Sequence, residues 1–157
     1  MQRADARTLV TLLHLRDLAS RAGKQLAIAS EMLDDRNRAL AQVTRVDDVI
    51  VSDRLISLLV TQISENPTLA AVFDELFTAE GSEVYLRPAS EYVRPGARTN
   101  FATIVEAARR RGETAIGYRV RAQANDETAA YGVHVNPPKS QPVSLADGDR
   151  VIVLALD

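Results

Sequence analysis

The sequence predicts an α/β fold followed by an α+β fold. Residues 1–81 are expected to form a partial Rossmann-like parallel unit with a helix pair, and residues 82–157 a small β-α-β-β module. Two observations predict this division. The aliphatic run 49–51 is typical of a strand buried on both faces, and an apolar helix pattern follows it directly. Beyond residue 81, apolar and polar residues alternate, as in a strand with one solvated face.

The first elements follow from periodicity and capping. Residues 4–22 show helical periodicity, and Gly23 is placed to end that helix. Residues 25–30 predict a short buried strand. Asp34 and Asp35 then favour the positive end of a helix that runs to about Thr44.

The next strand, 48–51, runs into Ser52-Asp53, which we expect to be the N-cap pair of a helix from 53 to about 66. Pro67 ends that helix, and a second helix from about 68 to 77 follows at once. Two parallel strands do not make a stable sheet alone. We therefore expect that the chain is a piece of a longer protein or that a partner completes the layer.

The second module is expected to contain four strands and one helix. Asn100 or Thr99 caps the helix, and Gly112 ends it. The expected strands are 82–87, 114–121, 131–136 and 150–156, and the expected helix is 100–111.

The helix from 53 to 66 is apolar on more than one side. A helix with so little polar surface must be buried against more than its own sheet, and a second copy of the chain is the expected partner. The sequence therefore predicts a homo-oligomer, a dimer or a ring. The predicted interface consists of Leu55, Leu58, Leu59, Gln62, Ile63, Pro67, Leu69, Val72, Phe73 and Leu76.

Composition excludes several classes of protein. The net charge is −2, with 19 basic and 21 acidic residues, so no bulk charge attracts nucleic acid or anionic membranes. The absence of cysteine excludes disulfides and thiolate chemistry. No apolar run approaches the roughly 18–20 residues that cross a bilayer, so we expect this piece to be soluble and not inserted in the membrane.

Candidate metal ligands are Asp47, Asp48 and Asp53, because carboxylates near the ends of strands can supply oxygens to a divalent cation. Helix-dipole and turn chemistry also explains these residues. His14 and His134 share no motif and are expected to be structural.

Arg109 and Lys139 are candidates for an anion or phosphate site. The alternative is that Arg109 and the two arginines after it only complement the negative end of their helix. No nucleophile with an adjacent base is evident, so we expect no catalytic residue and no enzyme activity.

The order of these elements resembles a known family. It is similar to the RCK or TrkA-type regulatory domains of potassium channels, and in particular to Castor/Pollux-like ion channels and their bacterial relatives. In that family the second module is a TrkA-C-like lobe. The residues that carry the resemblance are Val51–Leu59, Gly81–Leu86, Phe101–Ala108, Ala115–Tyr118, Asn136–Lys139 and the closing 148–153.

The resemblance implies a cytoplasmic regulatory domain that couples ligand binding and subunit rearrangement to conduction of potassium or another cation. Its partners would be further copies and the rest of a membrane channel. The family's glycine-rich nucleotide loop is absent from this sequence, so the cofactor stays unknown. Two alternatives remain open: a fragment of a nucleotide-dependent oxidoreductase, and a stand-alone regulatory subunit of a potassium transporter.

Overall fold

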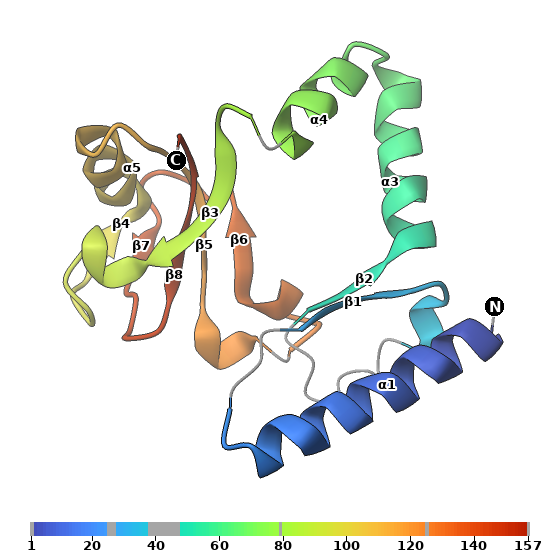
Figure 1. Cartoon of the computed structure of the whole chain (residues 1–157). Helices are drawn as coiled ribbons and strands as arrows, with labels where there is room; N and C mark the ends of the chain where they lie inside the picture. Colours follow the sequence, from blue (N-terminus) through green and yellow to red (C-terminus); the bar gives the residue numbers. More distant parts are fainter. Residues whose placement is uncertain (1, 25–27, 38–47, 79, 125, 157) are drawn as a thin grey trace. The chain divides into compact units, whose positions relative to one another are not determined.

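The computed structural model describes residues 2–24, 28–37, 48–78, 80–124 and 126–156 (Figure 1). The chain divides into two compact units, Met1–Ala70 and Ala71–Asp157. The boundary between the units falls within helix α4 (Leu69–Phe77), although the sequence predicts that this helix belongs to the first lobe.

The first unit contains a parallel strand pair. Strand β1 (Ala29–Met32) pairs in parallel with β2 (Asp48–Val51), from Ala29 opposite Asp48 to Met32 opposite Val51. Helix α1 (Gln2–Arg21) precedes the strand pair. Gly23 follows the helix and has a φ of 62°. The predicted parallel pairing is confirmed, but the predicted burial of the second strand on both faces is wrong, because Ile50 of β2 is 51% exposed.

One prediction between α1 and β2 needs correction, and another lies mostly outside the described residues. The predicted strand at 25–30 begins later, at Ala29, and residues 25–27 lie outside the described part of the chain. Of the helix expected to run to about Thr44, the described residues contain the 3-10 turn η1 (Asp35–Asn37). Residues 38–47 lie outside the described residues.

A buried carboxylate holds η1 and the end of β1 to the start of α1. Asp5, on the first turn of α1, is only 2% exposed. Its carboxylate accepts hydrogen bonds from the backbone N–H groups of Leu33 and Asp34 at 3.0 and 3.1 Å, and from the side-chain amide of Asn37 at 2.6 Å. The hydrogen bond from Leu33 contributes most to lowering the pKa of Asp5, which favours the ionised form.

Helix α3 (Ser52–Glu65) begins one residue earlier than predicted. Val51 is the N-cap and supplies no side-chain hydrogen bond, so the predicted Ser52-Asp53 cap is wrong. The reason is that β2 runs into the helix without an intervening residue, which places Ser52 inside the first turn. Its hydroxyl donates instead to the carboxylate of Glu31 on β1. The helix ends at Asn66 before Pro67, as predicted, and α4 follows.

The second unit contains a four-stranded antiparallel sheet in the order β3-β8-β5-β6. Helix α5 (Phe101–Arg110) packs on one face of it, and a short pair, β4 (Thr99–Asn100) with β7 (Pro142–Val143), lies beside the helix. The predicted module of four strands and one helix is confirmed. The sheet strands are β3 (Glu83–Pro88), β5 (Thr114–Arg119), β6 (Val133–Val135) and β8 (Arg150–Ala155).

Local signals position α5 and the sheet. The side chain of Asn100 accepts a hydrogen bond from the N–H of Thr103, which confirms it as the helix cap. Strand β6 begins later than predicted because Ala130 and Tyr131 adopt left-handed φ values of 49° and 55°. They form part of a 3-10 turn (Ala130–Gly132) that the alternating sequence pattern did not reveal.

Candidate functional site

Helix α3 presents an unusually wide apolar surface. At about 100° of rotation per residue, its aliphatic side chains occupy an arc of about 200°. An ordinary surface helix has an apolar stripe about half as wide. We call this the α3 apolar arc. It consists of Leu55, Ile56, Leu58, Leu59, Val60 and Ile63.

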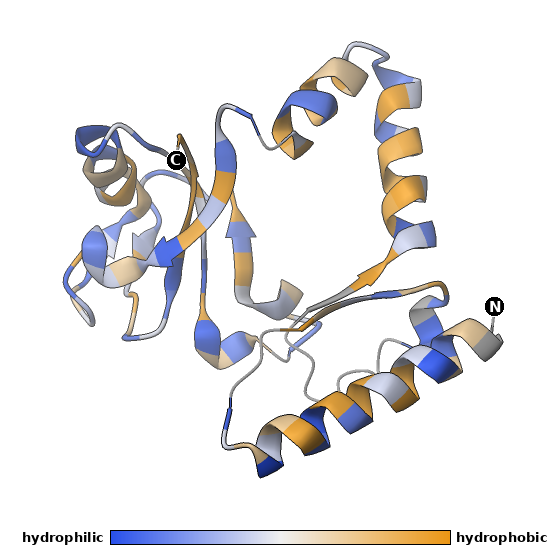
Figure 2. Ribbon diagram, viewed as in Figure 1, coloured by the Kyte–Doolittle hydropathy of each residue, from blue (hydrophilic) through white to orange (hydrophobic). Residues whose placement is uncertain are grey.

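Most side chains of the α3 apolar arc are exposed, and Leu59 and Ile63 are half-buried. No residue of α3 is buried. Ile56 is 58% exposed, Leu58 57% and Val60 60%. Figure 2 shows hydrophobic residues around much of this helix. Such a surface is typical of a subunit interface rather than of a solvated helix.

The remaining side of α3 is polar, but its hydroxyl groups bond within the helix. Ser57 donates to the carbonyl oxygen of Asp53, and Thr61 to that of Ser57, at 2.7 and 2.8 Å. These hydroxyls therefore need few water partners. The same side also carries the exposed charged residues Asp53, Arg54 and Glu65, so it is suited to solvent rather than to an interface.

Helix α4 also exposes large apolar side chains. Val72 is 47% exposed and Phe77 68%, and no residue of this helix is buried. The rings of Phe73 and Phe77 stack with centroids 6.2 Å apart and an interplanar angle of 12°. The helix carries Asp74 and Glu75 but no basic residue, so its charged groups are all acidic.

Burying the exposed side chains of α3 would contribute a large stabilising free energy for a domain of this size. Fully burying an aliphatic side chain stabilises a protein by about 1.5–3 kcal/mol. Leu55, Ile56, Leu58 and Val60 each retain roughly half of their surface in solvent. Covering the four would contribute about 3–6 kcal/mol, a substantial fraction of the roughly 5–15 kcal/mol by which a domain is stable.

The predicted interface residues all lie on α3, α4 or the turn between them, and each is exposed or half-buried. Ile56 and Val60 also contribute to the apolar pattern that predicts burial of this helix against a partner, and they are exposed, although the interface set above does not include them. Phe77 of α4 was missing from the prediction and is also exposed. Phe77 would have been found from its spacing of four from Phe73.

The structure does not bring the predicted metal ligands together. Asp47 lies outside the described residues, and Asp48 begins β2, whereas Asp53 follows the opposite end of that strand in the first turn of α3. Their backbones are thus separated by the length of the strand. Among the described residues, no three His, Cys, Asp or Glu side chains are grouped as a metal site. Binding of a cation here stays a prediction.

Arg109 and Lys139 lie at opposite ends of α5. Arg109 is on its last turn, where its Nε donates to Glu106 at 2.8 Å. The Nζ of Lys139 is 4.5 Å from the ring centroid of Phe101, the first residue of α5. The two residues are therefore about 12 Å apart along the helix. Hydrogen bonds from Arg109 and Arg110 lower the pKa of Glu106 to about 2, so the charge of Arg109 is already matched within this three-residue ion network.

One charged cluster was not predicted. Glu113, whose side chain is 8% exposed, lies 3.4 Å from both Arg87 and Arg111, and it accepts a 2.5 Å hydrogen bond from the hydroxyl of Tyr92. Desolvation, followed by the neighbouring Glu113 carboxylate, raises the pKa of Tyr92. Arg87, Tyr92 and the turn that holds Arg111 and Glu113 come from separate parts of the chain, and no sequence spacing connects the three. The cluster ties η2 (Ala89–Glu91) to the end of α5.

Comparison with known proteins bears on the function. No protein-family model matches the chain. The chain is 32% identical over 162 residues to "Ion channel CASTOR" of Lotus japonicus, a match that covers 86% of the chain. It is 32% identical over 181 residues to "Ion channel DMI1" of Medicago truncatula, covering 97% of the chain. This chain is a relative of one segment of the Castor/Pollux ion channels. The predicted resemblance is confirmed.

The chain spans only about a fifth of these relatives, 18% of CASTOR and 20% of DMI1. Among solved structures, it is similar to "GsuK channel bound to NAD" and "Crystal Structure of the GsuK RCK domain", with TM-scores of 0.37 and 0.36 at 18% identity. The alignments cover 96% of this chain, and 23% and 28% of those chains. TM-scores of this size do not establish a common fold, and the sequence relatives carry the assignment.

None of the helices in the described part of the chain combines the length and apolar composition of a membrane-spanning segment.

Proposed function

We propose that this chain is part of a regulatory domain on the cytoplasmic side of a cation channel, where it couples subunit rearrangement to ion conduction. The observation that carries the proposal is the match to proteins named ion channels over 86–97% of the chain. The exposed surface of α3 and α4 supplies a physical means, because a subunit can act on a pore only through a stable contact with its neighbours.

In the proposed mechanism, two copies of the chain associate through the α3 apolar arc and α4. A ligand that binds one arrangement of the paired subunits more tightly shifts the population toward that arrangement. A ten- to hundredfold difference in affinity corresponds to roughly 1.4–2.8 kcal/mol per site, so several subunits must act together. The helix pair would transmit the change because it joins the two compact units of each copy.

The alternatives differ in what the rest of the protein does. An oxidoreductase fragment would need a catalytic acid or base, and the relatives described above are ion channels rather than oxidoreductases. A stand-alone subunit would bind a separate transporter protein. The gating role is favoured over both because the match extends across nearly the whole chain within channel sequences.

Association is tested first, by analytical ultracentrifugation at tens of micromolar. We expect the wild-type chain to sediment as a dimer or larger species and Leu58→Glu to sediment as a monomer, because the substitution places a charge in the α3 apolar arc. The matched control is Thr61→Glu, the same new side chain on the polar side of the same helix. A monomeric wild-type chain at these concentrations contradicts the proposal, and so does equal association of Leu58→Glu and wild type.

Function is tested in the full-length protein that carries this segment, reconstituted in liposomes. Cation flux is recorded while nucleotides and divalent cations are added one at a time. We expect at least one of them to change the flux, and Leu58→Glu to abolish the response while Thr61→Glu preserves it. Absence of cation flux in the reconstituted protein rejects the channel role. Unchanged regulation in a variant that no longer associates rejects the role of the interface.

A further inference from the structure

The sheet face opposite α5 carries two arginines side by side. Arg119 on β5 and Arg150 on β8 are direct partners in the antiparallel register, so their side chains lie on the same face. Paired positions of this kind have Cβ atoms about 5 Å apart. The next register pair, Tyr118 with Val151, belongs to the buried core under α5. Because side chains alternate along a strand, the arginines face away from that helix.

This arrangement is unfavourable unless an anion accompanies it. Like charges directly opposite each other on a sheet destabilise the pair. Within the described part of the chain, neither arginine forms an ion pair, and the Nε of Arg119 is buried without a hydrogen-bond partner. A buried donor left unsatisfied has lost its water without compensation.

The nearest acidic side chain in sequence does not neutralise the pair. Asp149, which precedes Arg150, is 4% exposed, and both of its carboxylate oxygens serve the backbone. They accept from the N–H of Arg121 at 2.8 Å and from that of Ala146 at 2.7 Å. The other arginine cluster of this unit, by contrast, is matched: Arg110 contacts Glu106 and Arg111 contacts Glu91.

The chemistry of the face beside the arginines is apolar. The adjacent cross-strand row consists of Leu86, Ile152, Gly117 and Val135. Leu86 is 50% exposed and Val135 64%, whereas Ile152 between them is only 7% exposed, so the row is open to a ligand at its two ends. A molecule that carries both an anionic group and an apolar part would complement the two rows together.

We propose that Arg119 and Arg150 bind the phosphate group of a small molecule whose apolar part lies on the row of Leu86, Ile152 and Val135. Phosphate fits better than carboxylate because one bidentate arginine fork already satisfies both oxygens of a carboxylate. A phosphate has three terminal oxygens and up to two negative charges, so it can accept from both guanidinium groups. This site does not depend on the proposed channel function or on the surface of α3.

Binding is measured on the full chain by isothermal titration and by NMR of the arginine Nε–H groups, with ionic strength held constant by sodium chloride. The probes are inorganic phosphate and phenyl phosphate. We expect both to shift the Nε–H signal of Arg119, and phenyl phosphate to bind more tightly because its ring reaches the apolar row. We expect Arg119→Gln and Arg150→Gln each to weaken binding at least about tenfold, as loss of a charge-assisted hydrogen bond does.

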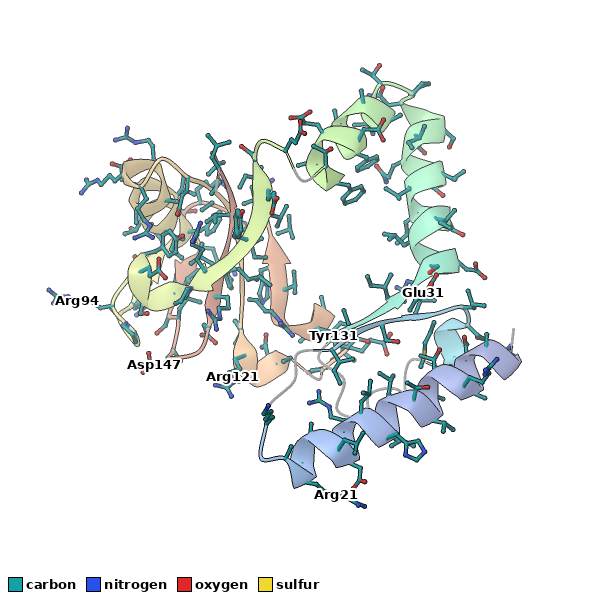
Figure 3. The ribbon with its side chains drawn as sticks, in the orientation of Figure 1. Arg21, Glu31, Arg94, Arg121, Tyr131 and Asp147 are labelled. Carbon is teal, nitrogen blue, oxygen red and sulfur yellow. The ribbon has the colours of Figure 1, made fainter. Side chains whose placement is uncertain are left out.

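The matched control is Arg94→Gln, which removes the same charge from an exposed loop of the same unit (Figure 3). It should bind as the wild type does. A second test measures thermal stability without ligand. Arg150→Gln should raise the melting temperature of the phosphate-free protein, because it removes the like-charge pair. Equal weakening by Arg94→Gln, or an unshifted Arg119 Nε–H signal, overturns the site. Equal affinity for the two probes overturns the contribution of the apolar row.

Discussion

The two compact units of this chain bury their apolar side chains to very different extents. In Ala71–Asp157, twelve buried residues from α5, the sheet and its loops form one continuous core. In the described part of Met1–Ala70, the core cluster consists of Leu12 and Met32, with Leu9 and Ile28 packed at its edge. The first unit leaves a series of large apolar side chains exposed: Val10, Leu13, Leu15, Leu18, Ile50, Leu55, Ile56, Leu58 and Val60.

The two units therefore differ in the source of their stability. In the second unit, α5 covers one face of its own sheet and closes a core, although Leu86 and Val135 stay exposed on the other face. The described part of the first unit has two parallel strands, too few for a stable parallel sheet. Its exposed apolar surface is available to a partner, and association then supplies stability that the isolated unit lacks. The predictions below test this asymmetry.

The largest effect is expected in the core of the second unit. Phe101 is fully buried, and its ring centroid lies 6.1 Å from that of Tyr118. Phe101→Ala should lower the free energy of unfolding by about 3–5 kcal/mol, because it removes a large buried side chain and leaves a cavity. Urea denaturation followed by tyrosine fluorescence measures this, since all four tyrosines lie in the second unit. A decrease of less than about 1 kcal/mol in the free energy of unfolding would show that this core does not determine the stability of the second unit.

The corresponding substitution in the first unit is Asp5→Ala. It removes the acceptor of three hydrogen bonds and leaves the N–H groups of Leu33 and Asp34 without that partner. We expect a loss of about 2–3 kcal/mol confined to the first unit. Amide hydrogen exchange should show faster exchange in α1 and β1, and unchanged exchange in α5. Equal changes in both units would mean that they unfold as one.

Acid should reproduce this loss in the wild-type protein. Because the folded-state pKa of Asp5 is lowered, its contribution is complete above the ordinary value of 3.8 and is lost as the pH falls through the lower folded value. An NMR titration of the Leu33 amide from neutral to strongly acidic pH should therefore show a transition below 3.8. In Asp5→Asn, which cannot ionise, the transition should be absent. A midpoint above 3.8 in wild type would contradict the assignment.

Sequence reasoning was most successful where local signals act alone. Asn100 as a helix cap, Pro67 as a helix stop and a strand at 48–51 with its aliphatic run 49–51 each need only neighbouring residues. It failed where long-range contacts decide. Ser52 was predicted to cap α3, but β1 lies beside it and offers the carboxylate of Glu31. The Arg119–Arg150 pair depends on strand register across 31 positions, which no local pattern fixes.

The left-handed turn before β6 offers a smaller test within the well-packed unit. Ala130 has a φ of 49°, a conformation that costs an alanine about 1 kcal/mol more than a glycine. Ala130→Gly should therefore stabilise the second unit by up to about 1 kcal/mol in urea denaturation. The matched control is Ala124→Gly, at an ordinary helical φ of −60°, which should destabilise it by about 0.5–1 kcal/mol. If both changes destabilise the unit equally, the turn is not strained.

The smallest effect on the isolated chain is expected on α3, at a residue as apolar as any in the core. Leu58 is 57% exposed, so Leu58→Ala should change the free energy of unfolding of the dilute, monomeric chain by less than about 0.5 kcal/mol. At concentrations where the wild type associates, the same substitution should lower the unfolding midpoint, because association stabilises only the folded state. Ile104→Ala, at a fully buried position of α5, should instead lower the midpoint equally at every concentration. Unfolding curves recorded across a hundredfold range of protein concentration distinguish the two. A concentration-independent effect of Leu58→Ala would place this side chain in an internal core and remove the physical basis for an interface on α3.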